Sequence, residues 1–276
     1  GIEGTFSWKD KIGRGITYGV TLNASYNMSR LLKWNDILTR TSENGGSKIF
    51  IDMPYDFVYA YEAVGIAQTW EDVYNATPQG ISPGDIIRKD LNGDGRIDNN
   101  DMKAHPRVSR DRPTTFFGLN GYVAWKGFDV VFLLQGATGR KDFWLNIYNN
   151  VNFGAQRYAS TWDHWYNTWS VENREGPWPR LGGSGNNQAT GNAAAGNTTF
   201  WLDDMSYVRL KNVQLGYSVP AKWLNKVGLN SLRIAGSAEN LATITNFRGL
   251  DPEKGGNNNN VYPINKAYSL SIQLGL

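Results

Sequence analysis

The chain has 276 residues, of which 40% are hydrophobic and 13% aromatic, so it can form a sizeable core. Its formal net charge of +3 provides no electrostatic footprint for nucleic acid, and its lack of cysteine excludes thiol catalysis, disulfides and thiolate metal sites. The 31 glycines and the low charged fraction of 19% are typical of an all-β protein with many turns.

The clearest pattern lies in residues 15–29, where apolar and small polar residues alternate strictly from Ile16 to Met28. Twelve steps of roughly 3.3 Å, tilted by about 45°, give a band roughly 28 Å tall. That height matches the apolar belt of an outer-membrane barrel, whereas a strand of a globular protein is usually about half as long. Length and the small, uncharged second face therefore favour a barrel.

Six further segments show the strand pattern, namely 5–9, 115–125, 128–134, 206–219, 232–239 and 268–276. They are joined alternately by short links (10–14, 126–127, 220–228) and long ones (32–114, 138–205, 242–261). Transmembrane barrels have short periplasmic turns and long extracellular loops, so we predict that the three long links are extracellular. Seven strands cannot close a barrel alone, and Gly1 opens the chain within a predicted strand with no signal peptide, so we expect a fragment of a longer protein.

Residues 90–101, inside the first long link, have the ligand spacing of a calcium loop. Such a loop places oxygen ligands at offsets 1, 3, 5, 7, 9 and 12, with glycine at 6. The matching positions are Asp90, Asn92, Asp94, the Arg96 carbonyl, Asp98 and Asp101, with Gly95 at the turn. The sequence therefore predicts a structural calcium site.

Two features of this stretch depart from an EF-hand. The last ligand is Asp101 where a longer glutamate is usual, which predicts modest affinity. The preceding Pro83-Gly84 predicts a turn, so no helix leads into the loop. The alternative interpretation is an Asx-rich turn that binds no metal.

The second long link holds six of the 11 tryptophans. Indole rings offer a large contact area with one polar edge, which suits stacking on sugars or peptide side chains. We therefore consider these six as candidate substrate contacts: Trp144, Trp162, Trp165, Trp169, Trp178 and Trp201. The alternative is that most of them pack the core of their own loop, since few residues of a surface dominate binding.

Several motifs in order resemble the C-terminal portion of SusC/RagA-type TonB-dependent outer-membrane transporters of Bacteroidota. They are Pro83-Gly-Asp-Ile with the calcium-type loop, Trp125-Lys-Gly-Phe-Asp129, Leu134-Gln-Gly136, Tyr207-Val-Arg-Leu-Lys-Asn-Val-Gln-Leu-Gly-Tyr217, Phe247-Arg-Gly-Leu-Asp-Pro-Glu253 and Tyr262-Pro-Ile. The set covers most of the chain. Leu276 departs from the aromatic residue that usually ends such barrels.

The resemblance implies a barrel of about 22 strands with a plugged lumen, set in outer-membrane lipid. It implies TonB-dependent import of oligosaccharides or peptides under a SusD-like lipoprotein. The plug and the TonB-contacting segment would precede Gly1.

Two other classes are consistent with part of the sequence. A soluble, calcium-stabilised carbohydrate-binding β-sandwich would use the loop tryptophans as a sugar platform, and a dockerin-like module would need a second calcium loop. Enzymatic activity is not expected, because the two histidines, His105 and His164, lie in no catalytic motif.

Overall fold

The computed structural model describes residues 1–13, 15–33, 53–54, 56–109, 112–143, 166–180, 198–225, 228–249, 251–254 and 264–275. Its main element is one antiparallel sheet in the order β1-β2-β7-β8-β11-β12-β13. These strands are β1 (Ile2–Ile12), β2 (Ile16–Tyr26), β7 (Thr115–Trp125), β8 (Phe128–Thr138), β11 (Tyr207–Ser218), β12 (Ser231–Thr245) and β13 (Ala267–Gly275). The seven strands predicted from alternation are confirmed, although several run further than the pattern indicated.

Strand pairing aligns the two faces across the whole sheet. Leu22 pairs with Leu119, which pairs with Leu134, while their neighbours Thr21 and Asn120 pair on the other side. Because side chains alternate along each strand, matched register gives the sheet one apolar face and one polar face. Apolar-face side chains are open: Phe6 is 61% exposed, Leu215 57%, Leu270 74% and Ile272 65%. An apolar surface of this size marks a membrane or interaction face.

Aromatic rings on the apolar face cover glycines of the neighbouring strand. Phe132 lies over Gly121 and Phe117 lies over Gly136, so a Cβ at either glycine would overlap the ring. Near the short turns, Phe128 packs on Tyr217 with ring centroids 4.4 Å apart, and Lys126 lies over the ring of Trp125. Such aromatic residues at the border of an apolar band are typical of the membrane interface.

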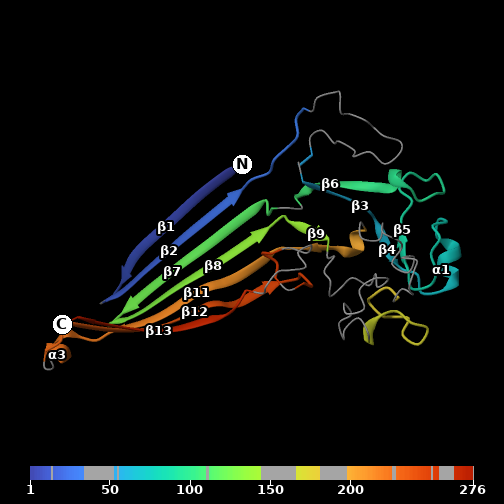
Figure 1. The fold of residues 1–276 in the computed structure, drawn as a ribbon. Coiled ribbons are helices and arrows are strands. Elements are labelled where there is room, and N and C mark those ends of the chain that lie inside the picture. Colours follow the sequence, from blue (N-terminus) through green and yellow to red (C-terminus); the bar gives the residue numbers. More distant parts are fainter. Residues whose placement is uncertain are drawn as a thin grey trace.

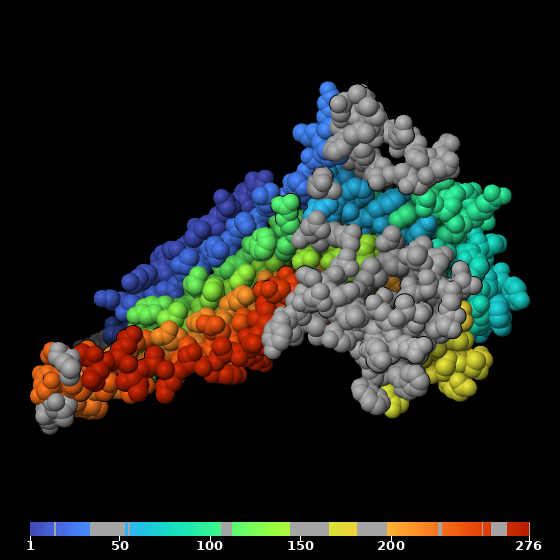
Figure 2. All heavy atoms as spheres, in the orientation of Figure 1, coloured from blue at the N-terminus to red at the C-terminus, as the bar shows by residue number. Residues whose placement is uncertain are grey.

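The remaining elements form a body at the end of the sheet where the long links lie, which we call the loop body (Figures 1 and 2). Its described residues form three two-stranded sheets, β3 (Phe57–Tyr61) with β6 (Met102–Ser109), β4 (Ala63–Ile66) with β5 (Ile86–Arg88), and β9 (Lys141–Phe143) with β10 (Leu202–Asp204). The helices are α1 (Trp70–Asn75), the 3-10 turns η2 (Asn99–Asp101) and η4 (Thr199–Trp201), and, at the opposite end of the sheet, α3 (Ala221–Leu224). None of the described helices is long and apolar enough to cross a membrane.

The β-sandwich alternative required a second sheet over the apolar face. Within the described parts of the chain, the other sheets have two strands each and belong to the loop body. Among these residues no second sheet covers the apolar face, which favours the barrel interpretation over the sandwich.

Candidate functional site

The loop body has a core shared by all three long links. Val58, Ala60 and Ile86 come from the first link, Phe247 comes from the third, and the second supplies Phe143, Trp178, Trp201 and Met205. Trp178 stacks on Trp201 with ring centroids 6.1 Å apart. Because these residues lie far apart in sequence, the three links fold as one unit.

Ion pairs between the links reinforce this core. Arg180 donates to the fully buried Asp85 over 2.9 Å, which joins the second link to the first. Arg248 of the third link donates through Nε to Asp203 over 2.8 Å and lies over the ring of Trp178. Burial raises the pKa of Asp85 above its usual value, although the Arg180 hydrogen bond acts in the opposite direction.

The structure describes three of the six candidate tryptophans. Trp178 and Trp201 are only 7% and 3% exposed, so they pack the core of the loops, as the alternative interpretation predicted. Neither presents a ring face to a ligand. Trp169 is half-buried and packs beside Gly84, where a Cβ would overlap its ring. Trp144, Trp162 and Trp165 lie outside the described residues, so their substrate role stays a prediction.

The calcium-type loop lies between β5 and β6 without flanking α-helices, as the turn at Pro83-Gly84 predicted. Asp90 accepts N–H groups from Gly93 and Gly95, and the buried Asp101 accepts those of Leu91 and Asp98. Burial would raise the pKa of Asp101, but these backbone donors outweigh it and the pKa is lowered.

These contacts are those of an Asx-rich turn, yet the two Asp90 oxygens accept one N–H group each and keep a lone pair for a hard cation such as calcium. Among the described residues, no group of three or more His, Asp or Glu side chains is gathered closely enough to hold a metal ion. The donor chemistry therefore fits calcium, whereas binding requires the carboxylates to move together.

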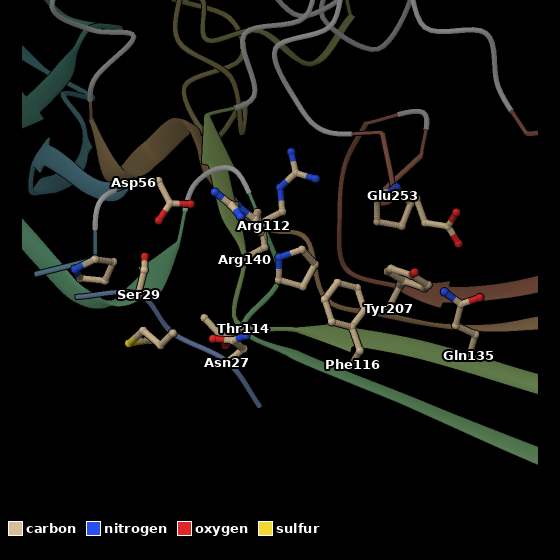
Figure 3. A pocket seen from close by; sticks show the side chains of 14 residues that line it. Asn27, Ser29, Asp56, Arg112, Thr114, Phe116, Gln135, Arg140, Tyr207 and Glu253 are labelled. Carbon is tan, nitrogen blue, oxygen red and sulfur yellow. The ribbon is translucent and has the colours of Figure 1, made fainter. Parts of the chain in front are cut away.

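The polar face of the sheet meets the loop body at a cavity of about 510 Å³, which we call the mouth cavity (Figure 3). Phe116 and Tyr207 project from the strands, and Arg112, Arg140 and Glu253 supply charges from the links. The remaining lining residues are Asn27, Met28, Ser29, Pro54, Asp56, Pro113, Thr114, Gln135 and Pro252. Apolar walls with a few convergent polar groups are typical of ligand sites.

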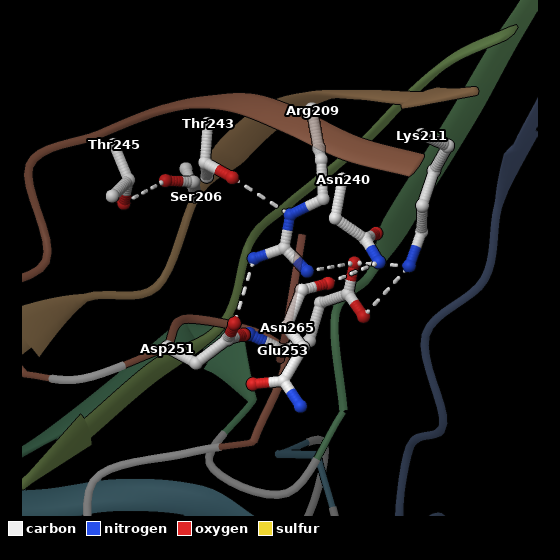
Figure 4. A network of polar contacts seen from close by, with 9 residues as sticks. All are labelled: Ser206, Arg209, Lys211, Asn240, Thr243, Thr245, Asp251, Glu253 and Asn265. Atoms are coloured by element: carbon white, nitrogen blue, oxygen red, sulfur yellow. Dashed lines mark hydrogen bonds and ion pairs between the residues drawn. The ribbon is translucent and has the colours of Figure 1, made fainter. Parts of the chain in front are cut away.

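A buried ion network holds one wall of the mouth cavity (Figure 4). Arg209, 2% exposed, donates to Asp251 over 2.8 Å and to Thr243 over 2.8 Å, and it pairs with Glu253 over 3.0 Å. Lys211 binds the same Glu253 carboxylate over 2.9 Å. The network therefore fixes the segment 251–254 of the third link against β11.

The sequence alone does not reveal this cavity, because its lining comes from several separate segments. One signal was available: Phe116 and Tyr207 place aromatic rings on a face that otherwise carries mostly small polar residues.

The structure describes one of the two histidines, His105. Burial lowers the pKa of His105, with Lys103 and Lys141 acting in the same direction, so the imidazole is neutral at neutral pH. His164 lies outside the described residues.

The comparisons with known proteins agree with this architecture. No protein-family model matches the chain. TonB-dependent receptor P3 of Formosa agariphila is 29% identical over 94% of this chain, and receptor P39 of the same organism is 25% identical over 90%. The chain covers only 25% and 26% of these two relatives. The solved RagAB peptide transporter superposes on 99% of this chain and 29% of its own, with a TM-score of 0.71 at 22% identity.

The chain forms part of the wall of an outer-membrane β-barrel and is similar to TonB-dependent receptors. The predicted resemblance, all-β fold and membrane location are thereby confirmed. The apolar face is the lipid-facing side of this barrel wall and the polar face is its lumen side. The chain spans about a quarter of the length of the curated relatives it matches.

Proposed function

We propose that the protein containing this chain imports oligosaccharides or peptides across the outer membrane, using energy delivered through TonB. The carrying observation is the seven-stranded wall, apolar toward lipid and polar toward the lumen, in a chain similar to TonB-dependent receptors. In this proposal the long links face outward, because barrels of this kind have short periplasmic turns. The TonB-contacting segment would belong to the part of the relatives that this chain does not cover.

The mouth cavity would contact the cargo as it enters the lumen. Phe116, which is 44% exposed, offers a stacking surface, and Arg140 and Glu253 add charged groups of opposite sign. This chemistry suits peptides, which carry both charges, and also glycans, which stack on aromatic rings. A solved structure with the same fold is named a peptide transporter, which favours peptides as the first cargo to test. A SusD-like lipoprotein would cover the mouth from outside.

Uptake into whole cells tests this function. Fluorescent oligosaccharides and peptides would be offered to cells that carry the full-length gene, lack it, or carry it without TonB. We expect uptake of one cargo class to require both the gene and TonB, and a SusD-like lipoprotein to co-purify. Uptake that continues without TonB, or a full-length protein that stays soluble and monomeric without detergent, would refute the proposal.

We also propose that residues 90–101 bind calcium and thereby stiffen the loop body. The glycine turns at Gly93 and Gly95, with φ of 77° and 79°, already fold the chain around Asp90. A cation would neutralise the carboxylates and draw them together without catalysing any reaction. Slower hydrogen exchange of these residues on addition of calcium would support this role, and unchanged exchange would contradict it.

A further inference from the structure

A second cavity lies in the loop body, beside α1 and β5 at the end remote from the barrel wall (Figure 1). It is an open depression of about 810 Å³. Its walls combine apolar side chains with two tyrosines, a glutamine and one arginine: Val73, Ile81, Tyr61, Tyr74, Gln79 and Arg88. We call it the Arg88 cavity. None of its lining residues lines the mouth cavity.

Arg88 is the unusual member of this cavity. Arg88 is only 7% exposed. Among the described residues, however, no carboxylate lies within ion-pair distance of its guanidinium. Nε donates to Gln79 over 3.3 Å, and the guanidinium carbon lies 5.2 Å from the ring centre of Tyr61. Neither terminal nitrogen donates a hydrogen bond to another described residue.

A buried cation without a counter-charge is costly, since water no longer solvates it fully. Burial lowers the pKa of Arg88 below its usual value, but arginine stays charged at neutral pH. Asp101 acts on this charge from beyond ion-pair distance, while its own oxygens accept the N–H groups of Leu91 and Asp98. An anion entering the cavity would supply the missing partner.

The surroundings hold the guanidinium in place. The Gln79 side-chain amide accepts from the Arg88 backbone N–H over 2.9 Å and donates to the Arg88 carbonyl over 3.1 Å. These two hydrogen bonds fix Gln79 against the backbone of Arg88. Tyr61 donates to Asn99 over 3.3 Å, which leaves its ring face under the guanidinium. The Arg88 guanidinium is therefore held in place before any ligand binds, and the edge that carries its two terminal nitrogens remains free to donate hydrogen bonds.

Tyr74 adds an apolar contact at the cavity rim. It is 80% exposed and lies 6.1 Å from the ring of Trp70, itself 56% exposed, one turn earlier on α1. The capping box of Thr69 and Asp72 fixes this short helix. Exposed aromatic pairs of this kind mark contact surfaces for ligands.

We propose that the Arg88 cavity is a binding site for a carboxylate-bearing ligand, with the carboxylate paired to Arg88 and the adjoining part of the ligand against Tyr74. A single guanidinium matches a single negative charge in the bidentate geometry that carboxylates form. The carboxylate can belong to a uronic-acid sugar or to an acidic peptide. The site lies apart from the mouth cavity and does not depend on import.

Calorimetry on the full-length protein in detergent tests the proposal with four probes: tri-galacturonate, neutral galactotriose, tri-glutamate and tri-glutamine. We expect at least one acidic probe to bind about tenfold or more tightly than its neutral counterpart, and the one that binds identifies the source of the carboxylate. Arg88→Met should abolish this preference, Arg88→Lys should keep part of it, and Tyr74→Ala should weaken binding a few-fold.

Tyr74→Ala keeps the proposal testable if Arg88→Met fails to fold. The Tyr74 side chain is exposed, so the thermal unfolding of this variant should match that of the parent protein. Lys222→Met is the matched control, since it removes one exposed cation from α3, lines neither cavity and should leave the preference unchanged. The proposal is overturned if no acidic probe binds, if neutral probes bind equally well, or if a folded Arg88→Met protein binds as before. Equal loss of the preference in Lys222→Met would show that it does not depend on Arg88 in particular and would also overturn the proposal.

Discussion

Arg233 on β12 reaches across β11 to Asp129 on β8, where its Nη2 lies 2.8 Å from the carboxylate Oδ2. The intervening residue is Gly216, and a Cβ at this position would collide with both Arg233 Nη2 and Asp129 Oδ1. The ion pair therefore joins three neighbouring strands on the lumen face because the middle strand carries no side chain there.

Gly216→Val should separate this pair and lower the free energy of barrel unfolding by about 1–3 kcal/mol, the range for losing a partly buried charged contact. Heat-modifiability on gels, which reports the temperature at which the barrel unfolds, measures the effect. Gly236→Val is the control, because no atom lies within 4 Å of a Cβ there. Equal unfolding temperatures for the two variants would show that the pair adds nothing to the wall.

The long lipid-facing strands could be predicted because their alternation is set by neighbouring residues alone, as in Ile16 to Met28. The irregularity in β11 could not. Register shifts between Leu210 and Asn212 against both neighbours, so Lys211 is an extra residue and the inward-facing positions change from odd to even numbers. Arg209 and Lys211 can thereby both reach Glu253, whose position depends on a link more than forty residues away.

The loop body was harder to predict for the same reason. A tryptophan in a polar loop has the same local pattern whether it packs inside or binds a ligand, and the partners of Trp178 come from segments that the sequence does not place together. The turn at Gly84, by contrast, could be predicted from the local sequence Pro83-Gly84, and the φ of 91° at Gly84 confirms it.

Trp201→Ala should destabilise the loop body by about 3–5 kcal/mol, because it removes a buried indole and leaves a cavity between the three links. The barrel wall should unfold at an unchanged temperature, since the buried residues of this core belong to the links and not to the strands of the seven-stranded sheet. Limited proteolysis of the loops, followed beside heat-modifiability, separates the two effects. Trp223→Ala on α3, 56% exposed, should change neither, and a proteolysis rate in Trp201→Ala equal to the parent's would exclude the shared core.

The pair Asp85–Arg180 predicts an asymmetry between its two partners. Arg180→Met leaves a fully buried carboxylate without its cation and should accelerate loop proteolysis strongly at pH 7. Asp85→Asn removes the buried charge but keeps a similar shape, so its effect should be smaller.

The pH dependence of this pair has a definite sign. Because the folded-state pKa of Asp85 is raised above 3.8, the folded loop body takes up a proton more readily than the unfolded chain. Its contribution to stability therefore increases as the pH falls through the raised pKa toward 3.8. Limited proteolysis across the same pH range measures this effect. The parent protein should become more resistant as the pH falls, and Asp85→Asn should not. An Asp85→Asn profile identical to the parent's would show that another group titrates.

Removal of calcium should affect the loop body and spare the barrel wall. At a calcium concentration 100 times the dissociation constant, binding adds about 2.7 kcal/mol to the stability of the folded form, which a chelator would abolish. Asp94→Asn should remove most of this response without disturbing the metal-free fold, because Asp94 is exposed. Asp10→Asn, at the opposite end of the molecule, is the control, and a calcium response retained in Asp94→Asn would exclude the proposed ligand set.

The mouth cavity depends on Arg209 for the position of Glu253. Arg209→Met leaves Asp251 buried and unpaired, which should cost roughly 3–5 kcal/mol and release the segment 251–254 from β11. Lys211→Met removes a more exposed cation from the same carboxylate, so its cost should be about 1 kcal/mol or less. Cargo affinity should fall in the same order, because Pro252 and Glu253 form one wall of the cavity. If both variants bound cargo alike, the network would hold the link without shaping the site.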